Sequence, residues 1–187
     1  MNSNTTNHRD LSVSMGKANL YSLFFAVPAA IILTSAYLVF WGKAGFIDAR
    51  ITISRNFLLS IVIVLIGVLL HELIHGLSWV WFGKKPLSAI KYGFYLKALT
   101  PYAHCNEPLN ITAYRLGALM PGLVLGIIPS IIGIISGAGT IMIFGLLFTA
   151  AAGGDAMILW LLRNEKSGVQ VIDHSVNAGC YIIDSEK

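Results

Sequence analysis

The chain has 187 residues, of which 56% are hydrophobic and only 12% are charged, and its mean hydropathy is +0.72. Soluble domains carry about 25% charged residues, so this composition excludes an ordinary soluble domain and indicates a membrane protein. The net charge of +4 is explained by lysine and arginine beside the predicted spans and does not indicate binding to nucleic acid.

The chain divides into a polar start, a membrane domain and a short tail. Residues 1–19 are rich in Asn, Ser and Thr, and we expect a flexible segment apart from a short interfacial helix. Residues 20–163 form the predicted membrane domain, and residues 164–187 form a cytoplasmic tail with the alternation of a small hairpin. Four apolar stretches reach the roughly 20 residues that a spanning helix needs. They are residues 20–41, 57–82, 111–136 and 140–162.

Lysine and arginine gather in the amino-terminal segment, in the loop after the second stretch and in the tail. Because such residues favour the cytoplasmic side, both termini are predicted to be cytoplasmic, in a multi-pass protein of the inner membrane. Cys105 and Cys180 then lie on the reducing side, and no disulfide is expected.

The second stretch contains the motif His71-Glu72-Leu73-Ile74-His75. On a helix the two histidines lie one turn apart on one face, where their imidazole nitrogens can bind a single zinc ion. Glu72 can reach a zinc-bound water without binding the metal, which is the His-Glu-x-x-His arrangement of zinc hydrolases. The alternative is a polar stripe that packs or hydrogen-bonds against neighbouring helices.

The loop between the second and third stretches alternates in character over residues 90–99, which predicts a short β-hairpin. Its edge could pair with an unwound substrate segment, which makes Tyr92, Gly93, Phe94 and Tyr95 candidate substrate-binding residues. An interfacial loop lying flat on the membrane is the alternative. His104 is a candidate accessory zinc ligand, with a structural role as its alternative.

The last two stretches carry a broken helix and a second unusual charge. Pro121 and several glycines in the third stretch permit close packing and free backbone carbonyls near the proline. Asp155 in the fourth stretch precedes Arg163 by eight residues, as His75 precedes Gly83, so both lie at similar depth on parallel helices. Asp155 is therefore a candidate third zinc ligand; the alternative is a carboxylate hydrogen-bonded to a histidine or to Arg115.

These features resemble a family of bacterial membrane zincin peptidases of unknown function, which is similar to the site-2 protease class of intramembrane metalloproteases. The resemblance also involves residues 102–109, 120–122 and 173–174, and it covers most of the chain after about residue 55. It implies zinc bound by His71, His75 and Asp155, with Glu72 as catalytic base. Site-2 proteases usually present the third ligand in a Leu-Asp-Gly segment, whereas the order here is Gly-Gly-Asp.

The sequence thus predicts an all-α membrane protein with about four transmembrane helices, a β-hairpin-like loop between the second and third, and a small tail. The predicted function is an intramembrane zinc metallopeptidase that acts on membrane protein or peptide substrates within the lipid bilayer. Two alternatives stay open: an inactive zinc-binding scaffold or sensor, and a small ion transporter, which the absence of an internal repeat disfavours.

Overall fold

The computed structural model describes residues 8–95, 100–174 and 176–183. Three helical segments in this part of the chain are long and apolar enough to cross a membrane: α1 (Met15–Trp41), α3 (Phe57–Gly83) and the segment Ile111–Ser136. Only 11% of the most apolar window of α1 and of α3 is buried, so most of their apolar side chains face outward, as a bilayer requires. These segments confirm three of the predicted apolar stretches.

The third span changes its helix type in the middle. It consists of α4 (Ile111–Pro121), the π-helix η2 (Gly122–Ile127) and α5 (Ile128–Ser136). Pro121 has no backbone N–H and therefore cannot bond to the carbonyl of Gly117, four residues earlier on the helix. The irregular backbone predicted near Pro121 is present, and it frees a carbonyl that is used at the site described below.

The fourth apolar stretch differs from the prediction of one continuous span. Helices α6 (Gly139–Ala151) and α7 (Gly153–Leu162) meet at an angle of 42°. Glycine is a poor helix former, and the Gly153-Gly154 pair follows the break directly. A Cβ on Gly153 would lie 2.7 Å from the backbone oxygen of Ser22, so glycine allows α7 to pack closely on α1.

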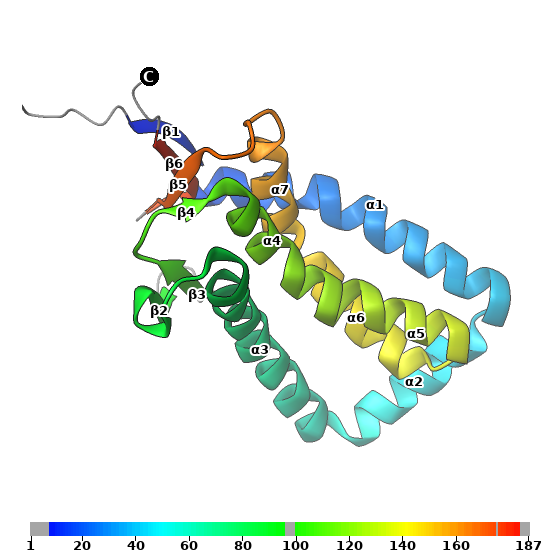
Figure 1. Ribbon diagram of the computed structural model, residues 1–187. Coiled ribbons are helices and arrows are strands. Elements are labelled where there is room, and N and C mark those ends of the chain that lie inside the picture. Colours follow the sequence, from blue (N-terminus) through cyan, green and yellow to red (C-terminus); the bar gives the residue numbers. More distant parts are fainter. Residues whose placement is uncertain (1–7, 96–99, 175, 184–187) are drawn as a thin grey trace, which may run out of the picture.

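Helix α2 (Ala44–Arg55) was not predicted from the sequence. It connects α1 to α3 at the end of the molecule opposite the β-sheets (Figure 1). It holds 12 residues with charged side chains among them, which is too short and too polar for a span.

The predicted hairpin between the second and third spans is confirmed for its described residues. After the 3₁₀ turn η1 (Leu87–Ala89), strands β2 (Ile90–Tyr95) and β3 (Thr100–Cys105) pair antiparallel. Lys91 lies opposite His104, and Tyr92 lies opposite Ala103. The predicted extended residues 96–99 lie outside the described part of the chain.

A second sheet joins both ends of the chain, in the order β1-β6-β5-β4. Its strands are β1 (His8–Val13), β4 (Leu109–Asn110), β5 (Gln170–Asp173) and β6 (Ala178–Ile183). The β5–β6 pair confirms the hairpin predicted in the tail. Within the predicted flexible segment, residues 8–13 form β1, which pairs antiparallel with β6, and α1 begins at Met15.

A buried apolar cluster joins this sheet to the ends of the helices that carry the candidate site. It includes the following residues: Trp79, Ile90, Cys105, Leu109, Ile111, Tyr114, Leu162, Val171, Cys180 and Ile182. Both sheets gather at this end of the molecule (Figure 1). The sheets and the cluster therefore form a rigid frame around the last turns of α3 and the first turns of α4.

Candidate metal centre

Helix α3 turns its polar residues inward and its leucines outward. His71 and His75 are each only 8% exposed, whereas Leu73 and Leu77 are 40% and 46% exposed. The two imidazole rings lie one turn apart with centroids 4.9 Å from each other. The arrangement is the reverse of a soluble amphipathic helix, and it suits a helix that faces lipid on one side and a polar centre on the other.

Asp155 of α7 meets both histidines. Its Oδ2 lies 3.2 Å from Nε2 of His71, and its Oδ1 lies 3.3 Å from Nε2 of His75. The Asp155 side chain is 16% exposed and sits in the first turn of α7, where the helix dipole favours a carboxylate. Arg115, the alternative partner of this carboxylate, donates instead to the backbone oxygens of Leu162 and Glu165.

These separations fit a zinc site. Zinc binds imidazole nitrogen and carboxylate oxygen at about 2.0 to 2.2 Å, and tetrahedral angles then separate two ligand atoms by roughly 3.3 to 3.5 Å. The two N···O distances of 3.2 and 3.3 Å lie close to that value. Two imidazoles and one carboxylate are also a ligand set that catalytic zinc sites use.

His75 is fixed in one tautomer by the carbonyl that Pro121 frees. Its Nδ1 lies 2.9 Å from the backbone oxygen of Gly117, and because a carbonyl only accepts, Nδ1 carries the proton. Nε2 is then unprotonated in the neutral ring and faces Asp155, as a metal ligand requires. Nδ1 of His71 is buried and has no hydrogen-bond partner among the described residues.

An aromatic stack holds His75 from behind. The ring of Trp79 stacks on His75 at 5.8 Å and on Tyr114 of α4 at 5.9 Å. A Cβ on Gly117 would overlap the Trp79 indole, so the glycine lets α4 approach α3 at this turn. The stack limits rotation of the imidazole and so preorganises it.

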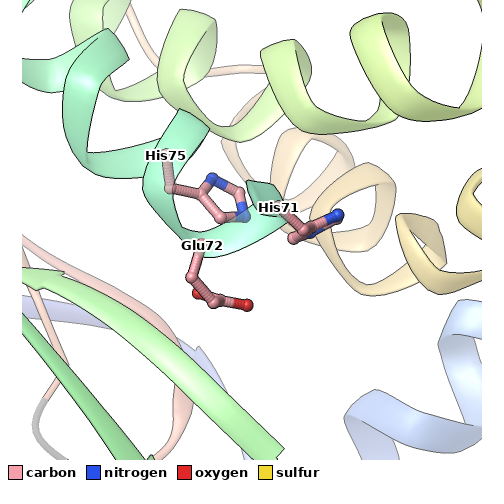
Figure 2. Close-up of side chains that lie close together, drawn as sticks. All are labelled: His71, Glu72 and His75. Carbon is pink, nitrogen blue, oxygen red and sulfur yellow. The ribbon is translucent and has the colours of Figure 1, made fainter. Parts of the chain in front are cut away.

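Glu72 lies beside the two histidines, whereas Asp155 forms its ion pairs with the histidines alone among the described residues. One potential ligand atom from each of His71, Glu72 and His75 lies within 4.8 Å of the other two. The three side chains lie close together on one turn of α3 (Figure 2). The backbone amide of Ala103 on β3 makes a hydrogen-bond interaction with the Glu72 carboxylate. Strand β3 therefore helps to orient the predicted catalytic base.

The candidate substrate residues lie on β2, next to this turn of α3. The Tyr92 hydroxyl occupies the space where a Cβ of Gly76 would stand, directly after His75. Gly93 faces the ring of Tyr102, and Phe94 is 53% exposed. Tyr95 ends the strand. Tyr92 thus contacts α3 directly after the histidine motif.

His104 pairs with a tail residue that sequence reasoning had not assigned to the site. Its Nδ1 lies 3.5 Å from Oδ2 of Asp173, and the same oxygen accepts a hydrogen bond of 2.9 Å from the Cys105 amide. Burial raises the pKa of Asp173, while the Cys105 amide and the Tyr114 hydroxyl stabilise its ionised form. In the sequence, Asp173 was marked by the resemblance at residues 173–174. In the structure, its bond to the Cys105 amide helps to hold the end of β3.

Residues 64–169 match the model of a protein family described as "Putative zincin peptidase". No curated protein and no solved structure matches the chain. The matched segment covers more than half of the chain and includes the histidine motif, the hairpin and Asp155. The chain therefore belongs to this zincin peptidase family.

Proposed function

We propose that this protein is an intramembrane zinc metallopeptidase that hydrolyses peptide bonds of membrane-associated protein or peptide substrates. The observation that carries the proposal is the convergence of Asp155 from α7 on both Nε2 atoms of the α3 histidines, beside Glu72. The family supports a zinc peptidase, and the apolar helices support a site at membrane depth.

His71, His75 and Asp155 would hold the zinc ion. When bound, zinc supplies a Lewis acid that polarises the scissile carbonyl and makes water a better nucleophile near neutral pH. Glu72 takes the proton from the attacking water and then delivers it to the leaving amine. The Ala103 amide holds the Glu72 carboxylate in place for both transfers.

A peptide bond inside a transmembrane helix is shielded by its own hydrogen bonds, so the substrate must unwind locally. In the two-stranded sheet, β2 pairs with β3 along one edge. Among the described residues no strand pairs with the other edge of β2, so an added strand could pair there. We place the unwound substrate along Tyr92–Tyr95, with main-chain hydrogen bonds supplying most of the recognition. The lysines and arginines of the sequence support cytoplasmic termini in the inner membrane.

The test is the zinc content of detergent-purified protein by elemental mass spectrometry. Wild type is expected to hold about one zinc per chain, and His71→Ala, His75→Ala and Asp155→Asn are expected to lose it. His104→Ala is the control, because His104 pairs with Asp173 and should leave the zinc content unchanged. A wild-type protein without zinc, after purification free of chelators, would refute the metal centre.

Glu72→Gln separates the peptidase from a zinc-binding scaffold. Glutamine has nearly the same shape but cannot accept the proton of water, so zinc should stay and turnover should fall by at least about 100-fold. Hydrolysis would be followed by mass spectrometry of transmembrane peptides reconstituted in liposomes. Full turnover in this variant would exclude Glu72 as the base, and binding without hydrolysis in wild type would favour the scaffold.

A further inference from the structure

A cavity of about 200 Å³ lies between α1, the α4–η2 segment and the α6–α7 pair. Phe25 and Ala29 line it from α1, Leu119 from α4, and Ala156 and Leu159 from α7. Asp155 is the charged residue in its described lining. Apart from Asp155 and Thr149, the side chains that line the cavity are apolar.

Two irregularities of the backbone face this cavity. One is the π-helix at Gly122–Ile127, and the other is the 42° bend between α6 and α7 at Ala152. π-Helical turns widen a helix locally and occur often at functional sites. Gly122 of the π-helix packs closely against Ala152, and Gly126 packs closely against Thr149, so the π-helix contacts α6 beside the cavity.

The cavity shares a wall with the candidate reaction site. Asp155 lines the cavity and also contacts Nε2 of both histidines, so the two spaces meet at a single side chain. An apolar cavity of about 150 Å³ is large enough to bind benzene, so about 200 Å³ holds one aromatic or branched aliphatic side chain. A whole acyl chain or a peptide segment needs more room than this.

We propose that this cavity receives one large apolar side chain of the substrate, from a residue that flanks the scissile peptide bond. The inference rests on the proposed metal centre and deepens the proposed function by naming the substrate class: segments with a Leu-sized or Phe-sized residue beside the cleaved bond. Small or charged residues at that position are poor substrates, because they leave the cavity empty or place a charge in it.

The test uses a series of peptidyl hydroxamates that share one zinc-binding group and one backbone and differ in a single side chain. The side chains are methyl, isobutyl and benzyl, and the dissociation constants are measured by calorimetry on the zinc-loaded protein in detergent. Filling an apolar pocket with one or more methylenes changes affinity by at least about tenfold. Wild type should therefore bind the benzyl probe at least about tenfold more tightly than the methyl probe.

Ala29→Leu reduces the cavity from the α1 side, away from the metal ligands. It should weaken the benzyl probe by about tenfold or more and leave the methyl probe within about twofold. Ala30→Leu, the same change one residue along α1 and outside the lining, is the matched control. Leu159→Ala enlarges the cavity instead, and it should shift the preference toward a naphthyl side chain if Ala29→Leu does not fold.

The outcomes separate the cavity from the peptidase function. Equal affinities across the series, equal weakening of all probes by Ala29→Leu, or no binding of any probe to zinc-loaded protein would each overturn the inference. Size-dependent binding without hydrolysis of any transmembrane peptide would support the cavity and refute the peptidase. Hydrolysis without any size dependence would support the peptidase and refute the cavity.

Discussion

Replacing Arg115 by glutamine is expected to destabilise the protein strongly, although Arg115 is not a site residue. Its guanidinium on α4 donates to the backbone oxygen of Leu162, the last residue of α7, and at 2.9 Å to the oxygen of Glu165. Carbonyls at a helix C-terminus have no partner within the helix, and a cation there is favourable. Arg115 therefore stabilises the C-terminal end of α7, the helix that carries Asp155.

The size of the effect follows from the two bonds. A hydrogen bond to a charged group contributes about 1.5 to 3 kcal/mol, and a partly exposed pair regains some hydration when it breaks, so we expect a loss of about 2 to 4 kcal/mol. For a chain of this length each kcal/mol lowers the melting temperature by about 2 to 4 °C, which gives a decrease of roughly 4 to 16 °C.

The measurement is thermal unfolding in detergent, followed by tryptophan fluorescence. Arg115→Lys keeps the charge and should lose about half as much as Arg115→Gln, because an ammonium lacks the fixed fork of the guanidinium. Lys166→Gln is the control, since it removes an exposed charge from the segment after α7. A melting temperature of Arg115→Gln within about 1 °C of wild type would refute the argument.

Three further changes test the frame around the centre. Gly76→Val would collide with the Tyr92 hydroxyl and should cost about 1 to 3 kcal/mol of unfolding free energy, measured by the same melts; an unchanged melt would contradict the packing. Asp173→Ala removes the acceptor of the Cys105 amide and should cost about 1 to 3 kcal/mol, whereas Asp173→Asn should keep part of it. Burial raises the pKa of Cys180 to about 12 from 9.0, so the folded thiol keeps a proton that the unfolded thiol loses above pH 9.0. The contribution of Cys180 to stability should therefore fall from pH 9.0 toward 12, by at most about 1.4 kcal/mol per pH unit, and Cys180→Ala should make the slope in pH-dependent melts shallower.

The spans and the histidine motif were predictable because they depend on composition and on local spacing. Hydropathy finds α3 and the Ile111–Ser136 span, since each residue contributes independently to the signal. The same windows cannot detect the bend at Ala152, because the bend depends on how closely Gly153 packs on the backbone of Ser22. Helix α2 was not predicted for a related reason: a short helix with mixed polarity has no strong periodic signal in its sequence.

The site was predictable in part. Counting residues from the predicted cytoplasmic ends of two helices brought Asp155 to the depth of His75, and the structure brings the two side chains together. The role of Gly117 was hidden, since the group that His75 bonds to is a backbone oxygen, which every residue has. The pairing of β1 with β6 and the contact of Asp173 with β3 join residues far apart in the chain, so local patterns do not predict them.

Helix α4 helps to hold the candidate ligands of the centre in place. Successive residues of an α-helix are about 100° apart, so Arg115 and Gly117 point to nearly opposite sides of α4. Gly117 faces α3, where its carbonyl bonds to His75 and Trp79 fills the space of its missing side chain. Arg115 reaches the end of α7, the helix of Asp155. Two residues of α4 therefore hold the helices that carry the candidate ligands: Gly117 binds His75 of α3, and Arg115 binds the end of α7. Both contacts lie outside the group of candidate ligand atoms, so α4 can position these atoms without binding the metal itself.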